Sequence, residues 1–222
     1  MATQTDPTAK PRSPLTRERV LGAAIALADA GGIDSLTMRK LGQELGVEAM
    51  SLYNHVANKD DILDGIVDLV FSEIQVPSDP ADWKAAMRRR GISVRNVLVR
   101  HPWATSLMQS RSKPGDSTLR HNDSVIGILR KAGFTIDMAA HAFSVMDGYI
   151  YGFALQQVNL PSRTSQESTA LAEGILRQLP ADKYPHFAEM ITEYALKPDY
   201  DYAREFEFGL DLILDGLERL RS

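Results

Sequence analysis

Residues 48–55 carry the side chains that could recognise a nucleic acid. In this segment of about eight residues, Leu52 and the following Val56 are apolar and recur at helical spacing. The other side chains are small, polar or aromatic: Glu48, Ala49, Met50, Ser51, Tyr53, Asn54 and His55. Such side chains on one exposed short helix suit the edges of bases in a major groove. The spacing alone fits an ordinary helical hairpin equally well, so both interpretations stay open here.

A tight turn must hold this segment against a preceding helix. Leu41 and Leu45 recur at helical spacing, and Gly42 is small enough for a partner helix to come close. Gly46 follows at the position where a left-handed residue lets the chain leave a helix. With Thr37 as an N-cap, residues 37–56 are therefore predicted to form a helix-turn-helix.

Two further helices flank this unit. Thr16 is a suitable N-cap for a helix that ends near Ala30, before two glycines. Asn58, followed by two aspartates, caps a fourth helix over about residues 59–75. At 1.5 Å per residue this helix would extend roughly 25 Å, far enough to connect the small unit to the rest of the chain. The prolines of residues 76–82 end it.

Composition excludes several classes of protein. The 222 residues include 44% hydrophobic side chains and no cysteine, which excludes disulfides, thiolate catalysis and Cys-based metal sites. The polar N-terminus resembles no secretory signal, and no apolar run reaches membrane-helix length, so we expect a soluble, cytoplasmic protein without membrane contact. The net charge is -4, but residues 1–59 hold 7 basic and 6 acidic side chains against 18 and 23 in the remainder. This asymmetry has the sign of an N-terminal DNA-binding unit but is small.

The remainder also follows a helical pattern, so the predicted fold class is all-α. We divide the chain into a disordered arm (1–14), a three-helix DNA-binding domain (15–59), a connecting helix (60–76) and a larger helical domain (77–222). Helices are expected at about 81–99, 102–109, 117–132, 137–158, 167–178, 183–196 and 200–220, separated by prolines and glycines.

Two of these helices, 137–158 and 201–221, are apolar around most of their circumference. Such helices must be covered on every side. Pairing with the same two helices of a second copy would cover them, and a monomer that uses both internally is the alternative. The residues assigned to the dimer interface are Tyr149, Phe153, Phe206, Leu210, Ile213 and Leu217.

Taken together, residues 15–75 resemble the DNA-binding region of the tetracycline-repressor (TetR) family. The resemblance rests on Gly-Ile-Asp-Ser-Leu-Thr (32–37), Leu-Gly-x-x-Leu-Gly-Val (41–47) and Leu-Tyr-x-His-Val-x-Asn-Lys (52–59). More loosely, Trp83, residues 100–103 (Arg-His-Pro-Trp), 131–134 (Lys-Ala-Gly-Phe), 148–153 and 206–210 are similar to the C-terminal domain of the tetracycline repressors. The resemblance implies a homodimeric transcriptional regulator, a repressor released from a palindromic operator by a small organic molecule. The first alternative is a regulator that binds DNA without a ligand, and the second is a helical protein that binds a small molecule or is an enzyme.

The resemblance also assigns roles to individual residues. Glu48, Ala49, Met50 and Ser51 would approach bases. Tyr53, Asn54 and His55 would hold the backbone or adjacent bases, although Tyr53 and His55 could instead pack within the domain. Phosphate or nearby contacts would come from Thr37, Arg39, Lys40 and Lys59.

The resemblance places a ligand cavity under the fourth helix. In tetracycline-binding members, histidines and a carboxylate hold a magnesium–drug chelate; here residues 71–75 contain no histidine, and Gln156 and Gln157 stand where a carboxylate would be expected. We therefore expect an apolar or aromatic organic ligand without metal or cofactor. The candidate lining is Phe71, His101, Trp103, Met108, Phe143, Met146 and Asp147, although residues of these types are individually more often core than ligand contacts.

No arrangement of catalytic residues is evident. The five histidines are scattered at 55, 101, 121, 141 and 186, and neither H-E-x-x-H nor a P-loop occurs. An enzyme is therefore not expected. The basic run Arg88–Arg90 is interpreted as a solvated helix face.

Overall fold

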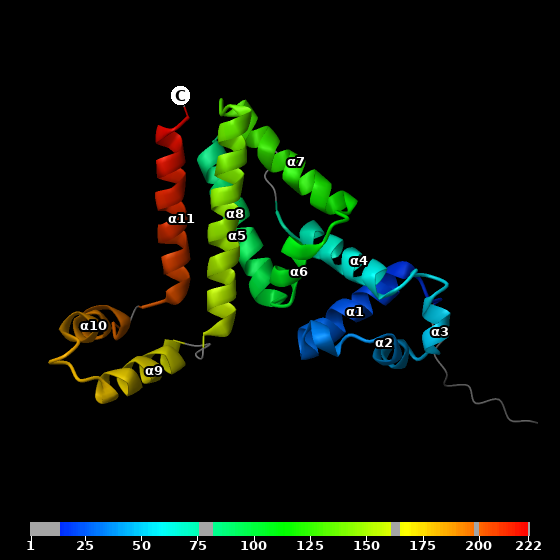
Figure 1. The fold of residues 1–222 in the computed structure, drawn as a ribbon, viewed down its shortest axis with the longest axis horizontal. Coiled ribbons are helices and arrows are strands. Elements are labelled where there is room, and N and C mark those ends of the chain that lie inside the picture. The colour runs from blue at the N-terminus through cyan, green and yellow to red at the C-terminus, as the bar shows by residue number, and fades with distance from the viewer. Residues whose placement is uncertain (1–13, 76–81, 161–164, 198–199, 222) are drawn as a thin grey trace, which may run out of the picture.

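The computed structural model describes residues 14–75, 82–160, 165–197 and 200–221 (Figure 1). These ranges are helical and contain no strand, which confirms the all-α prediction. The predicted arm lies, apart from Pro14, outside the described residues, and so does most of the predicted break at 76–82. None of the described helices combines the length and apolar character that a membrane crossing requires.

The N-terminal unit consists of α1 (Arg17–Gly31), α2 (Met38–Leu45) and α3 (Ala49–Leu52), with a 3-10 turn η1 (Ile33–Ser35) after α1. Thr16 and Thr37 cap α1 and α2 through their hydroxyl oxygens, as the sequence predicts. The narrow apolar stripes of the helices meet in one small core, where Val20, Leu41 and Leu52 are fully buried.

Helix α4 (Lys59–Ser72) connects this unit to the rest of the molecule (Figure 1). It packs against α1 on the N-terminal side and against α6 (Ala104–Ser110) and α7 (Asp116–Lys131) on the other. Its buried residues Ile62, Ile66 and Val70 recur every four positions. Any displacement of α4 would therefore change packing contacts in both the N-terminal unit and the rest of the molecule.

Helices α5 (Trp83–Arg100), α8 (Ile136–Asn159) and α11 (Tyr202–Arg219) form the main bundle, in which α8 packs against both α5 and α11 (Figure 1). Polar side chains also join α5 to α11. Arg88 pairs with Glu207 at 2.6 Å and with Asp211 at 2.8 Å, and the Trp83 indole donates to Glu218 at 2.7 Å.

The Arg88–Arg90 run is not uniformly a solvated face. Arg89 is exposed, but Arg90 points into the bundle and has an exposed fraction of 0%. The prediction for Arg90 is therefore wrong. Consecutive residues on a helix point about 100° apart, so a run of three charges cannot occupy one face.

Helices α9 (Ser165–Gln178) and α10 (Pro185–Met190) form an arm that extends away from the bundle in Figure 1. A π-helical turn, η2 (Ile191–Ala195), follows α10 and packs against both helices of the arm. Large apolar side chains on the arm are exposed, namely Tyr184, Phe187, Met190 and Tyr194.

Candidate functional site

The turn between α2 and α3 is built on two glycines. Gly46 has φ 68° and ψ 34°, a left-handed conformation that a side chain disfavours. The next amide, Val47 N–H, bonds back to the Gly42 carbonyl at 2.9 Å and so closes the helix end. A Cβ on Gly42 would lie 2.8 Å from the Val47 carbonyl oxygen and 3.2 Å from the Ala49 nitrogen. Only glycine at position 42 therefore lets α3 start this close to α2.

Helix α3 presents one face outward, as predicted. Leu52 and Val56 are 0% and 3% exposed and face the core, whereas Met50 is 75% exposed and Tyr53 46%. Glu48 and Asn54 are also exposed, and Ala49, Ser51 and His55 are half-buried.

The α-helix itself covers only four residues instead of the eight expected. After Leu52 the amides bond three residues back, as in His55 N–H to the Leu52 carbonyl at 2.9 Å. This tightening turns the chain so that Asn58 can cap α4, its side-chain oxygen accepting from Asp61 N–H at 2.9 Å.

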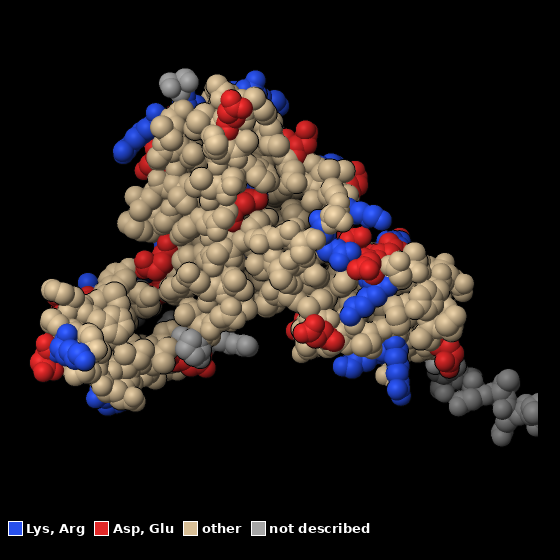
Figure 2. Space-filling view, in the orientation of Figure 1, with Lys and Arg blue, Asp and Glu red and all other residues tan. Residues whose placement is uncertain are grey.

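The residues assigned to phosphate contact lie around α3. Thr37, Arg39, Lys40 and Lys59 are all exposed; Thr37 caps the N-terminus of α2 and Lys59 begins α4, and helix N-termini favour phosphate. Figure 2 shows Lys and Arg side chains projecting from the α1–α3 end of the molecule, interspersed with acidic ones. The local charge is mixed, in agreement with the near-neutral balance of residues 1–59.

Arg17 fixes the orientation of this unit on α4. Its guanidinium contacts both carboxylate oxygens of Asp61, at 2.6 and 2.8 Å, and donates to the His55 carbonyl at 3.3 Å. The hydrogen bond from Arg17, together with one from Ala57 N–H, lowers the pKa of Asp61 to about 2. This role of Arg17 could not be predicted from local sequence, because its partner Asp61 lies 44 residues away.

Three of the predicted ligand-lining residues meet in the C-terminal bundle: Phe71 of α4 with Phe143 and Asp147 of α8. Between them lie two residues that the sequence analysis missed. Arg90 of α5 donates to Asp147 at 2.6 Å through Nη2 and to His121 of α7 at 3.1 Å through Nε. The Phe71 ring meets His121 edge-on at 5.4 Å, and the Arg90 guanidinium lies 5.6 Å from the Phe143 ring centre. We call Phe71, Arg90, His121, Phe143 and Asp147 the core cluster.

The core cluster is a polar group inside an apolar bundle. Arg90 and His121 are 0% and 4% exposed. Burial, reinforced by the positive charge of Arg90, lowers the pKa of His121 to about 3. Burial and the neighbouring Asp147 raise the pKa of Tyr151. Met146, also predicted to line the site, is 1% exposed on α8.

Two other predicted ligand residues, His101 and Trp103, contact Asp29 of α1 and Glu73, which follows α4. His101 Nδ1 lies 2.7 Å from Asp29 of α1, and its Nε2 lies 3.4 Å from Glu73 beyond α4. The Trp103 indole donates to the same Asp29 oxygen at 2.7 Å. We call Asp29, Glu73, His101 and Trp103 the junction cluster, because it joins the N-terminal unit to the bundle. Met108 of α6 is half-buried against the core.

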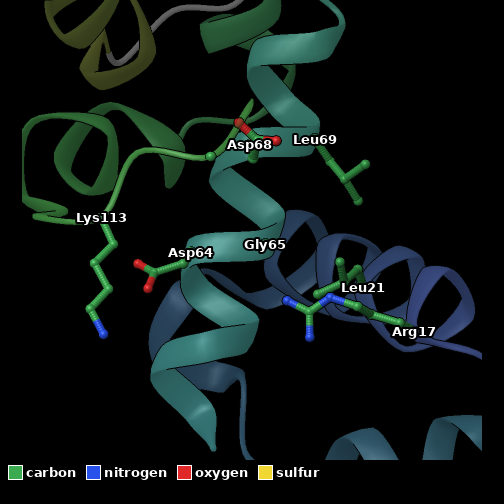
Figure 3. A pocket seen from close by; sticks show the side chains of 8 residues that line it. Arg17, Leu21, Asp64, Gly65, Asp68, Leu69 and Lys113 are labelled. Carbon is green, nitrogen blue, oxygen red and sulfur yellow. The ribbon is translucent and has the colours of Figure 1, made fainter. Parts of the chain in front are cut away.

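A surface cleft of about 240 Å³ lies between α1, α4 and the loop before α7 (Figure 3). Asp68 of α4 reaches across to α7, where it accepts hydrogen bonds from the amides of Ser117 at 3.2 Å and Thr118 at 2.8 Å. A side chain of α4 thus caps the start of α7. No predicted ligand residue lines this cleft, whose lining is Arg17, Leu21, Asp64, Gly65, Asp68, Leu69, Lys113 and Gly115.

Most residues assigned to a dimer interface are buried within the chain itself. Phe206 and Leu210 are 0% exposed, and Phe153 and Leu217 are also buried. Tyr149 is half-buried, with its hydroxyl bonded to the carbonyls of residues 205 and 206, and Ile213 is half-buried too. The large exposed apolar residues on the same two helices are Ile136, Val145 and Leu155 of α8 and Phe208 and Leu212 of α11.

Within the described ranges, no three His, Asp or Glu side chains are arranged to hold a metal ion. His101 has a carboxylate at each ring nitrogen, on opposite sides of the ring, so these groups do not converge on one point.

Comparison with known proteins identifies the family. A family model described as "Tetracyclin repressor-like, C-terminal domain" matches residues 76–221, and one described as "Bacterial regulatory proteins, tetR family" matches residues 20–66. The HTH-type transcriptional repressor DrrR1 of Streptomyces coeruleorubidus is 34% identical, over 96% of this chain and 81% of that protein. An HTH-type transcriptional regulator of Saccharopolyspora erythraea is 35% identical, over 91% of this chain and 84% of that protein.

Among solved structures, ActR of Streptomyces coelicolor in complex with actinorhodin matches with a TM-score of 0.77 and 29% identity, covering 95% of this chain and 100% of that chain. The match over nearly the whole length includes both the helix-turn-helix and the bundle that holds the core cluster. The chain therefore belongs to the tetR family of bacterial regulatory proteins, and it is a ligand-responsive, DNA-binding transcriptional regulator rather than an enzyme.

Proposed function

We propose that two copies of this chain bind a palindromic operator in the cytoplasm and repress transcription until an organic ligand releases them. Residues 15–59 would form the DNA-binding domain, residues 60–76 the connecting helix and residues 77–222 the domain for ligand and dimer contacts. The observation that carries the DNA-binding part is the turn at Gly42 and Gly46, which holds an outward-facing α3 rigidly against α2.

The exposure of α3 supports the division of roles among its residues. Met50 is 75% exposed and Tyr53 46%, and Glu48, Ala49 and Ser51 stand at the helix start, where side chains approach base edges. Asn54 and His55 follow in the turn, where they would meet the backbone. Phosphate contacts from Thr37, Arg39, Lys40 and Lys59 would set the register without choosing the sequence.

An exposed apolar face on α8 and α11 supports the dimer. Phe208 is 65% exposed, Leu212 58%, and Val145 and Leu155 51% each, on two helices that pack side by side. Gly148 and Gly152 add an open strip on α8, since a Cβ built on either meets nothing within 4 Å. Apolar patches of this kind typically mark protein–protein contacts. A second copy would cover them by the same two helices, as an isologous interface.

Helix α4 supports a coupling between ligand and DNA. Its Phe71 belongs to the core cluster, its Asp61 holds Arg17 of α1, and Glu73 just beyond its end belongs to the junction cluster. A ligand that favours a displaced α4 would change the separation of the two α3 helices, which must be about 34–36 Å to enter successive major grooves. The ActR structure with actinorhodin supports an organic ligand for a domain of this kind.

Selection of DNA from a random pool tests this function directly. We expect one palindromic sequence, bound by a dimer. Gly42→Ala should abolish this binding, because its Cβ would collide with the backbone of the turn. Gly22→Ala on the exposed side of α1 is the matched control, since a Cβ there meets nothing within 4 Å and operator affinity should be unchanged. Equal binding by both variants would contradict the assignment of α3.

Lys59→Ala tests a phosphate contact. We expect weaker binding to every duplex alike and a salt dependence of log K reduced by about one unit of slope. Lys183→Ala on the distant arm should change neither quantity. A loss of sequence preference in the Lys59 variant would mean that this residue contacts bases instead.

Leu212→Glu tests the dimer face. A charge placed on both copies at an isologous contact should give monomers in analytical ultracentrifugation and weaken operator binding. Asp123→Glu, at an exposed position of α7, serves as the control. A Leu212→Glu protein that stays dimeric would place the interface elsewhere.

A further inference from the structure

The outward side of α3 and the turn before it carry no basic or amide side chain. Residues 47–53 include no Arg, Lys, Asn or Gln, the residue types that read guanine and adenine with paired hydrogen bonds. This segment instead exposes a carboxylate, Glu48, and a thioether, Met50. The chemistry of these two side chains limits which base edges they can contact.

The turn fixes the backbone of Glu48 and leaves its side chain available. The residue is extended, with φ -66° and ψ 142°, and its carbonyl accepts from Ser51 N–H at 2.9 Å. The preceding amide, that of Val47, is held by the Gly42 carbonyl. The Glu48 carboxylate does not cap α3 and has no hydrogen-bond or ion-pair partner within the described ranges. It can therefore accept a hydrogen bond from another molecule.

A carboxylate in the major groove requires an amino group as its partner. Phosphates line the groove, so a carboxylate that has lost its water there is unfavourable unless it accepts a hydrogen bond. The groove presents two amino groups, N6 of adenine and N4 of cytosine. Adenine places its acceptor N7 beside N6, and this acceptor repels the second carboxylate oxygen. Cytosine has no acceptor beside N4 on its own groove edge, so Glu48 matches cytosine better.

Met50 presents an apolar group to the same groove. At 75% it has the highest exposed fraction of the large hydrophobic side chains in the described part of the chain. A thioether side chain makes only weak hydrogen bonds and is stabilised when contact removes it from water. The apolar group that the major groove offers is the C5-methyl group of thymine. Ala49 is less available, because it is half-buried and its backbone lies close to Gly42 of α2.

We propose that Glu48 and Met50 select the operator sequence. Each half of the palindrome, or half-site, contains a cytosine whose N4 amino group donates to the Glu48 carboxylate. At a second position it contains a thymine whose C5-methyl group contacts the Met50 side chain. This inference rests on the proposed binding of an operator by α3 and names the base edges that α3 reads.

Selection from a random pool of duplexes by the full-length Glu48→Gln protein, in parallel with the parent, tests the carboxylate. In the parent we expect one position of the half-site to be cytosine, where any other base weakens binding by about tenfold. A Gln amide both donates and accepts and so pairs with N7 and N6 of adenine. The variant should therefore prefer adenine at this position and keep the other positions unchanged.

Glu44→Gln is the matched control for this experiment. Glu44 is exposed on α2, and its substitution removes the same charge. Because this change acts on the attraction to phosphates only, we expect the affinity for all duplexes to change alike. The base preference of the Glu44→Gln protein should equal that of the parent at every position.

Replacement of thymine by uracil in the selected operator tests Met50. Uracil keeps every hydrogen-bonding group of thymine and lacks only the methyl group. At one thymine of a half-site, we expect this replacement to weaken binding by the parent about three- to fourfold in a mobility shift at fixed salt, the effect of one buried methyl group. Binding by Met50→Ala should weaken less than about 1.5-fold on the same replacement. The other thymines of the half-site serve as controls in both proteins.

Three results would overturn the proposal. They are a parent half-site without a fixed cytosine, a Glu48→Gln protein that keeps the cytosine preference, and uracil effects that are the same in Met50→Ala as in the parent. If the parent selects a palindrome in any of these cases, the proposed function stands and only the assignment of base edges fails. If the parent selects no palindrome, the proposed operator binding is wrong, and the assignment of base edges is wrong with it.

Discussion

The junction cluster and the core cluster each contain a histidine that is 4% exposed, yet the two environments differ in kind. His101 lies between two carboxylates, and each of its ring nitrogens is close to one of them. His121 lies beside an arginine, and one of its ring nitrogens has no partner among the described residues. The two histidines are thus equally buried, but the charges beside them are of opposite sign.

The difference indicates separate tasks. The polar groups of the junction cluster are paired between α1 and the segments that follow α4 and α5, so a displacement of α1 would break specific contacts. A cluster with unpaired donors inside one domain is suited to accept a molecule. The sign of the neighbouring charges, rather than burial, therefore separates the two histidines.

Asp147→Ala should have the largest effect, because it leaves Arg90 charged and unpaired at 0% exposure. We expect a loss of about 3–5 kcal/mol in the free energy of unfolding, measured by urea denaturation. Asp123→Ala, at an exposed position on α7, should change the stability by less than about 0.5 kcal/mol. A small loss at Asp147 would mean that the core cluster is as open to solvent as a surface pair.

The buried His121 should make the stability of the protein depend on pH. The pKa of His121 falls from 6.5 to about 3 on folding, so below pH 6.5 the unfolded chain binds a proton that the folded chain does not. Stability should therefore fall as the pH decreases, by about 2 kcal/mol between pH 7 and pH 5. His121→Gln should remove this loss of stability between pH 7 and pH 5, whereas His141→Gln should leave it unchanged. An unchanged slope in His121→Gln would contradict the buried neutral histidine.

A double-mutant cycle between Asp29 and His101 should give a coupling energy of about 1 kcal/mol, since the two side chains share one contact at 2.7 Å and both carboxylates of the cluster are partly exposed. Asp29→Ala combined with His121→Gln is the comparison, because these two residues have different partners. We expect those two effects to add. If the stability changes of the Asp29 and His101 substitutions simply add, the two side chains have no coupling energy, and a role of the junction cluster in coupling the two domains is contradicted.

Arg17→Met should have the smallest effect, below about 1 kcal/mol at neutral pH, because the ion pair with Asp61 is partly exposed to solvent. The pKa of Asp61 is lowered from 3.8 to about 2, so this stabilisation is present above pH 4 and is lost as the pH falls through 2. The variant should therefore lose less stability than the parent in that acid range, as measured by thermal unfolding. Arg89→Met is the exposed control.

The helices themselves could be predicted from local sequence. Thr16, Thr37 and Asn58 cap helices as expected, and Gly46 ends α2, because capping depends on residues within one turn of each other. The length of α3 could not, because it depends on where the chain must turn to let Asn58 cap α4.

The contacts of the candidate sites depend on pairs far apart in the sequence. Asp29 meets a histidine 72 residues later, and Arg90 meets Asp147 57 residues later. Phe71, Phe143 and Asp147 were predicted as ligand residues because their types suit a ligand site, and the structure brings them together around Arg90 and His121. Arg90 was missed because it follows two other arginines, and its inward direction depends on the helix phase, which Trp83, Met87 and Val94 share.

The predicted interface residues also show that contacts between distant parts of the chain cannot be predicted from local sequence. Apolar character on all sides of 137–158 and 201–221 indicates that these helices need cover, but not which side the chain covers itself. Phe206 and Leu210 turned inward, so the exposed side is the one of Phe208 and Leu212.

The indole of Trp103 bonded to Asp29 makes the junction optically visible. The chain has two tryptophans, and the other, Trp83, bonds to Glu218 at the far end of the bundle. Replacing Trp83 by phenylalanine would leave Trp103 as the single tryptophan. Its emission would then report whether the hydrogen bond between its indole and Asp29 of α1 is intact. Inducers could then be screened in solution, without DNA, by the shift in the wavelength of tryptophan emission that they cause.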